Sequence, residues 1–223
     1  MTKPKRNQPK KARLIPLQDG PLLYENEVNP EGNVIYDWHG NEISCEEPVC
    51  LCRCGGSADK LFCDGTHVKI GFSGRKESDG SVNGGRDYAG KRITIHDNRY
   101  LCSHAGFCWR ELPAVFRKEA RPWIDPDAAD PEDIIAVIEK CPSGALSYSI
   151  DGVEQKDPER KPAAIVAKDG PYCLVGGIEV VGCEPRAESV STEHCCCCRC
   201  GSSKNKPFCD GSHDRIDFKD AKD

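Results

Sequence analysis

The sequence predicts an α+β protein made of several small modules. Charged residues make up 30% of the 223 residues and aromatic residues only 7%, so a single large apolar core is not expected. Sixteen cysteines indicate that something other than packing holds each module together. A gapless internal repeat places two similar β-rich modules near the ends, on either side of a different segment.

The repeat defines the two outer modules. Its first copy, residues 50–67, reads CLCRCGGSADKLFCDGTH, and its second copy, residues 196–213, reads CCCRCGSSKNKPFCDGSH. Similar apolar and polar residues precede each copy, so the repeated unit extends well upstream of the cysteines. We therefore expect one domain over residues 14–75 and its counterpart over residues 162–223.

Short strands and tight turns are expected upstream of each copy. An Asp-Gly-Pro sequence occurs at residues 19–21 and again at 169–171, which is typical of a tight turn. Alternating or β-branched residues then follow at 33–36 and 173–181, as expected of short strands. Each outer module is thus predicted to be a small β-rich unit that closes on a segment rich in Cys and His.

Residues 86–151 form a module of another kind. Residues 71–90 are rich in glycine and residues 151–162 carry charges and proline, so both are expected to be linkers. Asp130 is a suitable N-cap before Pro131, and the apolar residues that follow predict a helix. The strands expected in this module cover residues 92–96 and 146–150.

Charge and hydropathy restrict the location and partners of the chain. Residues 1–13 are basic and polar, which predicts a disordered tail, but the net charge of −5 gives nucleic-acid binding no broad support. No apolar stretch is typical of a signal peptide or a membrane span, so we expect no membrane partner and a cytoplasmic location. In a reducing compartment, cysteines serve as metal ligands rather than in disulfides.

Each copy of the repeat contains three cysteines and one histidine with the spacing of metal ligands. Residues two apart in an extended chain point to the same side, so the Cys-x-Cys pair of each copy can chelate one metal ion. A Cys3His zinc site is the alternative for the same donors. The candidate ligands are Cys52, Cys54, Cys63 and His67 in the first copy, and Cys198, Cys200, Cys209 and His213 in the second.

These residues resemble the CDGSH iron–sulfur domain family. The second copy matches the family pattern at every position, and the first departs from it only at Leu61, where the family has proline, which puts the rigidity of that loop in doubt. The resemblance implies a redox-active [2Fe–2S] cluster in each copy, with the Cys-x-Cys pair on one iron and the third cysteine and the histidine on the other. A neutral imidazole in place of a thiolate should raise the reduction potential above the roughly −400 mV of plant-type ferredoxins.

The resemblance also predicts the overall architecture. Family members with one copy form homodimers, so a chain with two copies can make the same pairing internally. We expect the two CDGSH modules to pair about a pseudo-twofold axis, with a ferredoxin-like module inserted between them. The protein is accordingly expected to be a monomer.

The middle module contains a second cysteine motif. Cys102, Cys108 and Cys141, with the intervening His104 and the Cys-Pro-Ser-Gly-Ala-Leu sequence from Cys141, resemble the divergent single-cluster ferredoxin family. Three cysteines suffice for a [3Fe–4S] cluster, whereas a [4Fe–4S] cluster would take a fourth ligand from His104, water or a partner. Alternatively, His104 only hydrogen-bonds a cluster sulfur, or the module is purely structural.

Three functions are compatible with these sites. The first is an electron-transfer or redox-relay protein with unidentified redox partners. The second is a carrier that donates clusters to acceptor proteins, or a sensor of redox state or pH. The third is a structural zinc module. No substrate site is identifiable, so no enzymatic activity is predicted.

The other cysteines, including Cys195–Cys197, are expected to be small buried residues or reactive thiols.

Overall fold

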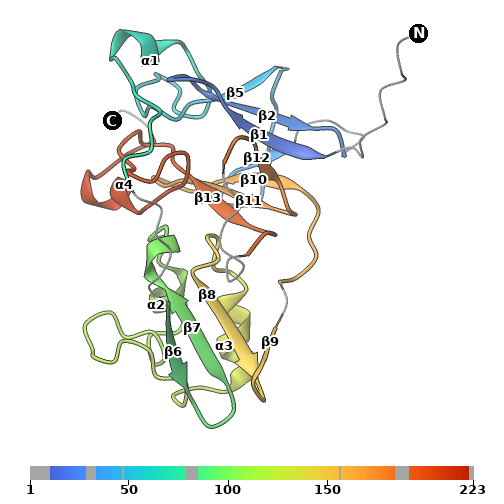
Figure 1. Cartoon of the computed structure of the whole chain (residues 1–223), viewed down its shortest axis with the longest axis vertical. Helices are drawn as coiled ribbons and strands as arrows, with labels where there is room; N and C mark the ends of the chain where they lie inside the picture. Colours follow the sequence, from blue (N-terminus) through green and yellow to red (C-terminus); the bar gives the residue numbers. More distant parts are fainter. Residues whose placement is uncertain are drawn as a thin grey trace.

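The computed structural model describes residues 11–28, 34–46, 48–78, 85–155, 157–183 and 191–220. Its strands form three sheets, with few and short helices (Figure 1). The predicted tail over residues 1–13 falls largely outside the described residues. Where the chain is described, Ala12 and Arg13 already belong to a strand, so the predicted tail extends too far.

Two of the sheets are built by the outer modules. The first has the order β12-β1-β2-β5, and the second has the order β13-β11-β10-β3-β4. The strands of the first are β1 (Ala12–Pro16), β2 (Leu22–Asn26), β5 (Val49–Leu51) and β12 (Glu179–Val180). Those of the second are β3 (Ile35–Tyr36), β4 (Glu42–Ile43), β10 (Ala163–Val166), β11 (Tyr172–Val175) and β13 (Cys195–Cys197).

Each of these sheets takes strands from both outer modules. Strand β12 of the second module runs parallel to β1, with Val180 opposite Leu14. Strand β3 of the first module runs parallel to β10, with Ile35 opposite Ala164. The stretch 173–181, where short strands are expected, contains the end of β11 and all of β12, and the stretch 33–36 contains β3.

A single apolar cluster therefore lies under both outer modules. It includes fully buried side chains from the first module and from the second, and each contributes about 1.5–3 kcal/mol when it is removed from water. The two outer modules therefore share this core. The largest of these side chains are Tyr24, Tyr172, Leu14, Leu22, Ile35, Leu51 and Leu174.

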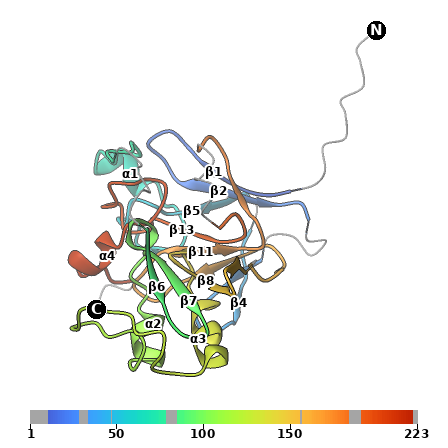
Figure 2. The same ribbon diagram turned by 60° about the horizontal axis from the view of Figure 1, so that its bottom comes forward.

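The middle module has its own sheet and core. Its antiparallel sheet has the order β6-β7-β8-β9, and two helices pack beside it (Figures 1 and 2). The elements are β6 (Gly85–Ala89), β7 (Thr94–Asn98), a 3-10 turn (Arg99–Leu101), α2 (Phe107–Glu111), α3 (Pro131–Ile138), β8 (Leu146–Ile150) and β9 (Val153–Glu154).

The middle module contains the helix and the final strand that the sequence predicts. The predicted helix is α3, with Asp130 at its N-cap and Pro131 at its first position, and the strand predicted over 146–150 is β8. The predicted linkers were too long, because β6 lies within 71–90 and β9 within 151–162. No helix in the described part of the chain is long and apolar enough to cross a membrane.

Candidate metal centres

Each copy of the repeat arranges its four candidate ligands in two donor pairs. The Sγ atoms lie 3.7 Å apart in the pair Cys52–Cys54 and 3.8 Å apart in the pair Cys198–Cys200. Two sulfur atoms bound at about 2.3 Å to one tetrahedral ion lie about 3.8 Å apart. The Cys-x-Cys spacing thus produces the separation that one metal ion requires.

The second donor pair joins the third cysteine to the histidine four residues later. The distance from Sγ to the histidine Nδ1 is 3.3 Å for Cys63–His67 and 3.5 Å for Cys209–His213. The histidines lie on the single-turn helices α1 (Thr66–Lys69) and α4 (Ser212–Arg215). In both copies the sequence therefore places one sulfur and one imidazole nitrogen side by side.

An aspartate fixes the loop that carries each second pair. Asp64 accepts hydrogen bonds of 2.9 Å from the backbone N–H groups of Ala58 and Thr66. These bonds hold the pKa of the Asp64 carboxyl well below its usual range, so it remains ionised and keeps accepting both bonds. In the second copy, Asp210 accepts the equivalent bonds, also of 2.9 Å, from Lys204 and Ser212.

A buried arginine between the two cysteines of each Cys-x-Cys pair was not predicted from the sequence. Arg53 donates to the carbonyl oxygens of Leu17 and Gly20 at 2.6 and 2.7 Å, which fixes the upstream turn against the ligand segment. Arg199 donates to Ala167 and Gly170 at the same distances. The arginine occurs at the same position in both copies of the repeat, and this repetition is the sequence feature from which its structural role could have been predicted.

Protonation of the thiols differs within a pair. A hydrogen bond from Cys200 lowers the pKa of the Cys198 thiol to about 7, although burial acts in the opposite direction. That bond, together with burial, raises the pKa of Cys200. Burial also raises the pKa of Cys209 well above its usual range. Metal binding therefore requires the release of thiol protons in this buried copy.

The two copies touch each other through the residues that follow their ligands. Cys54 and Cys200 form an isolated antiparallel β-bridge. Gly55 and Gly201 both have positive φ, and a Cβ atom on either would come within 2.5 Å of the carbonyl oxygen of Cys200 or Cys54, respectively. Only glycine permits this approach of the two backbones.

Leu61, which stands in the first copy where the family has proline, makes the same backbone contact as Pro207 makes in the second copy. Cys52 donates its N–H to the carbonyl oxygen of Leu61 at 2.9 Å, and Cys198 donates to Pro207 at 2.7 Å. The Leu61 side chain also packs against the shared apolar cluster. The loop is therefore tied to the ligand segment in both copies.

The three cysteines of the middle motif line one small cavity. Cys102 follows the 3-10 turn, Cys108 is the second residue of α2, and Cys141 follows α3. Burial, followed by the proximity of Cys141 and Cys102, raises the pKa of the Cys108 thiol to about 11. The fold thus brings together the three residues that the sequence singles out.

His104 lies beside this cavity but its ring contacts another module. Its backbone N–H donates to Cys102 Sγ at 3.4 Å. Its ring Nδ1 lies 3.9 Å from the Asp214 carboxylate, on α4 of the second outer module. In the structure, His104 therefore approaches the middle motif with its backbone and the second outer module with its side chain.

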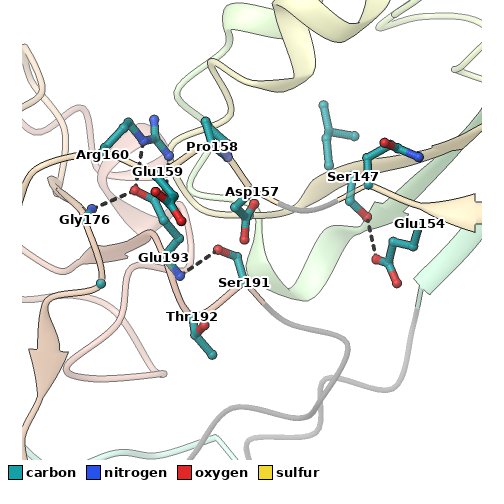
Figure 3. Close-up of a pocket in the computed structure, with 14 residues that line it drawn as sticks. Ser147, Glu154, Asp157, Pro158, Glu159, Arg160, Gly176, Ser191, Thr192 and Glu193 are labelled. Carbon is teal, nitrogen blue, oxygen red and sulfur yellow. Dashed lines mark hydrogen bonds and ion pairs between the residues drawn. The ribbon is translucent and has the colours of Figure 1, made fainter.

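The described residues bring no larger cluster of metal donors together. No three Cys, His, Asp or Glu side chains among them converge to hold a single metal ion. A cavity of about 750 Å³, lined by polar and apolar groups alike, lies between the middle module and the second outer module (Figure 3). Beside it, Ser191 Oγ and a Glu193 oxygen both lie 3.0 Å from the same ring nitrogen of His194, so His194 does not bridge them as a catalytic triad requires.

Comparison with known families agrees with this geometry. The model described as "Iron-binding zinc finger CDGSH type" matches residues 19–68 and 169–214. The model described as "Divergent 4Fe-4S mono-cluster" matches residues 88–151. No solved structure matches the chain.

Two curated relatives cover part of the chain. They are the proteins titled "Uncharacterized protein YjdI" from Escherichia coli K12 and from Escherichia coli O157:H7. Each is 42% identical over 68 residues, which is 30% of this chain and 90% of the relative. Together with the two donor pairs in each outer copy, these matches establish that the chain is an iron–sulfur protein of the CDGSH family with a divergent 4Fe–4S mono-cluster domain between its two CDGSH segments.

Proposed function

We propose that this protein transfers single electrons through three iron–sulfur sites. Each CDGSH copy takes a [2Fe–2S] cluster, and the middle motif takes a [3Fe–4S] or [4Fe–4S] cluster. The observation that supports this most directly is that each outer copy arranges its ligands in two donor pairs. In the first copy, the two sulfur atoms of Cys52 and Cys54 lie 3.7 Å apart, and Cys63 Sγ lies 3.3 Å from His67 Nδ1.

Two donor pairs favour a binuclear cluster over zinc. A structural zinc ion gathers four ligands around one centre. In a [2Fe–2S] cluster each iron takes two protein ligands and shares two sulfides, so the protein supplies one pair for each iron. The cluster supplies the one-electron chemistry, and the chain's own residues fix the donors, exclude water and set the local charge.

The two CDGSH modules pair about an internal pseudo-twofold axis, and the chain is a monomer. Reciprocal contacts support this pairing: β12 adds to the sheet of β1, and β3 adds to the sheet of β10. Gly55 meets Cys200 as closely as Gly201 meets Cys54. A homodimeric partner would have to compete with strands that are already in place.

The middle motif takes its cluster with Cys102, Cys108 and Cys141. Their position around one cavity supports this assignment. The ring of His104 lies toward α4, which favours the role in which His104 contacts the cluster region through its backbone. With three protein ligands, a [3Fe–4S] cluster or a [4Fe–4S] cluster with an external fourth ligand fits the site.

Elemental analysis with low-temperature electron paramagnetic resonance tests the proposal. We expect iron and acid-labile sulfide in amounts that require three clusters, two reduced [2Fe–2S] signals, and reversible reduction without loss of iron. Anaerobically prepared protein that is folded and colourless and contains zinc but no sulfide would refute it.

A second candidate function is donation of a cluster to an acceptor protein. The first copy favours it, because Cys63 and His67 are partly exposed, whereas Cys209 and His213 are buried. In this case incubation with a cluster-free acceptor should transfer the first cluster and leave the second. Reduction and reoxidation with all iron retained in the presence of the acceptor would favour electron transfer instead.

A further inference from the structure

Cys196 joins the second CDGSH site to the middle site. Its thiol donates to the carbonyl oxygen of Pro142 at 3.2 Å, and Pro142 directly follows the ligand Cys141. The carbonyl oxygen of Cys196 accepts from the backbone N–H of the ligand Cys209 at 2.9 Å. Two hydrogen bonds and a few covalent bonds therefore connect one ligand of the middle site with one ligand of the second CDGSH site.

The imidazole of His104 makes a separate contact between the same two sites. It packs so closely on Gly211 that a Cβ atom there would lie 2.7 Å from a ring carbon. Gly211 lies between the ligands Cys209 and His213, and His104 lies two residues after the ligand Cys102. The two ligand loops thus meet with no side chain between the ring and the glycine backbone.

An aromatic pair lies beside this contact. Trp38 stacks on Phe107 with 4.7 Å between ring centroids, and Phe107 precedes the ligand Cys108. Trp38 also packs against the small buried cluster that contains Cys196 and Cys209. The Cys196 end of the path is therefore buried in a small apolar cluster, whereas the His104 end borders a cavity of about 330 Å³ that Trp38, His213 and Asp214 also line.

The first CDGSH site keeps the backbone bond, since Cys63 donates its N–H to the carbonyl oxygen of Cys50 at 2.9 Å, but in the described part of the chain it shows no counterpart of the contacts that Cys196 Sγ and the His104 ring make. A Cβ atom added at Gly65, the counterpart of Gly211, would meet nothing within 4 Å. Cys50, the counterpart of Cys196, lies in β5 opposite Leu23 and is partly exposed. Helix α4 lies between α1 and α2 in both views (Figures 1 and 2).

We propose that the middle site and the second CDGSH site form a directly coupled electron-transfer pair, with Cys196 and His104 as positioning residues. This inference rests on the proposed function and specifies the order of its electron-transfer steps. Electrons pass between the first CDGSH site and the middle site only by way of the second CDGSH site or of outside partners. One electron leaves one member of the pair and enters the other, and no covalent bond of the protein forms or breaks.

Magnetic relaxation in the full-length chain tests the pairing. Cys63→Ala removes a ligand of the first CDGSH site and Cys209→Ala the corresponding ligand of the second, so each variant leaves one [2Fe–2S] signal to observe. In the Cys63→Ala variant, the electron spin of the remaining [2Fe–2S] cluster should relax faster than in an isolated cluster, because the cluster of the middle site lies nearby. Adding Cys102→Ala, which removes a ligand of the middle site, should abolish this increase in relaxation rate. In the Cys209→Ala variant, adding Cys102→Ala should change the remaining signal little.

The outcomes separate this inference from the proposed function. Equal enhancement of the two CDGSH signals, or a larger effect on the first, would overturn the pairing while the iron–sulfur function stands. Absence of [2Fe–2S] signals from the wild-type protein would overturn the proposed function and the pairing with it.

A double-mutant comparison tests the contact without relying on ligand variants. Gly211→Ala and Gly65→Ala place a side chain at nearly the same φ, +78° and +82°, but only the first meets His104. We expect Gly211→Ala to lower the thermal unfolding midpoint more than Gly65→Ala does. Adding His104→Ala to Gly211→Ala should raise the unfolding midpoint by the extra amount that Gly211→Ala had lost. Adding His104→Ala to Gly65→Ala should give no such increase. Equal losses in the two single variants, without recovery, would overturn the contact.

Discussion

At the scale of single residues, the buried arginines set the stability of each ligand segment. Arg199 is 2% exposed, donates two hydrogen bonds to turn carbonyls and pairs with Asp220. We expect Arg199→Met to reduce the free energy of unfolding by about 3–5 kcal/mol, because it leaves two buried carbonyl acceptors unpaired and removes the close charged partner of Asp220. Arg53→Met should cost less, about 2–4 kcal/mol, since Arg53 makes the two carbonyl bonds without such a close acidic partner. Urea unfolding measures both, and equal losses would contradict the role given to Asp220.

A second prediction at this scale concerns acid. Protonation removes the imidazole lone pair from a metal, and burial lowers the pKa of His213, so a lower pH than usual is needed to protonate it. We therefore expect the second CDGSH cluster to persist to lower pH than the first, whose His67 is partly exposed. The loss of visible absorbance at mildly acidic pH measures this in variants that retain one site.

The matched variants are His67→Cys and His213→Cys. A thiolate in place of the imidazole should make the altered site resist acid and leave the loss from the other site unchanged. Decay at the same rate in the wild type and in both variants would rule out the histidines as the acid-sensitive ligands.

At the scale of elements, the exchange of strands makes the two CDGSH modules one folding unit. Ile35 belongs to β3 of the first module, is fully buried, and pairs with β10 of the second. Ile35→Ala should reduce the free energy of unfolding by about 2–5 kcal/mol through the cavity that it leaves. Because the core is shared, circular dichroism and absorbance from both CDGSH clusters should report one coincident transition in urea. Val68→Ala, at a side chain that is 74% exposed, is the control and should change little.

The segment that leads into β13 provides a pH-dependent contribution to stability. Burial alone would raise the pKa of the Glu193 carboxyl, but hydrogen bonds from His194, Arg160 and Gly176 outweigh it and lower the pKa to about 2. A depressed pKa contributes stability that is complete above the unfolded value of about 4.5 and is lost as the pH falls toward 2.

Glu193→Gln tests this contribution. At neutral pH the substitution should cost about 2–3 kcal/mol, and the difference from wild type should shrink between pH 4.5 and pH 2. Glu179→Gln is the control, because Glu179 is half exposed and lies 3.7 Å from Lys11 in an ion pair that contributes little. A difference that does not vary with pH would exclude the carboxylate as the source.

At the scale of the whole molecule, the sequence predicts what depends on neighbours in the chain. The donor pairs follow from local spacing, since Cys52 and Cys54 lie two residues apart and Cys63 and His67 lie four apart. Helix α3 begins as predicted because its N-cap and first-position signals are also local. The boundaries of the linkers were less predictable, since β6 and β9 are held mainly by pairing with other strands.

What the sequence does not reveal depends on contacts between distant segments. Nothing near Ile35 indicates that β3 pairs with β10 rather than with a strand of its own module. Cys196 could be interpreted only as a small buried residue or a reactive thiol until its contact with Pro142 was known. The direction of the His104 ring depends likewise on the glycine of a remote loop.

The last prediction concerns the oligomeric state. If strand exchange occurs within one chain, folding involves no association, and the unfolding midpoint should not depend on protein concentration. If the same exchange occurred between two chains, the midpoint would rise with concentration by mass action. Thermal unfolding over a hundredfold range of concentration, with scattering mass measured at both ends, distinguishes the two. We expect a constant midpoint and the mass of a single 24.5 kDa chain, because β1 and β10 each already have a partner strand from the other CDGSH module.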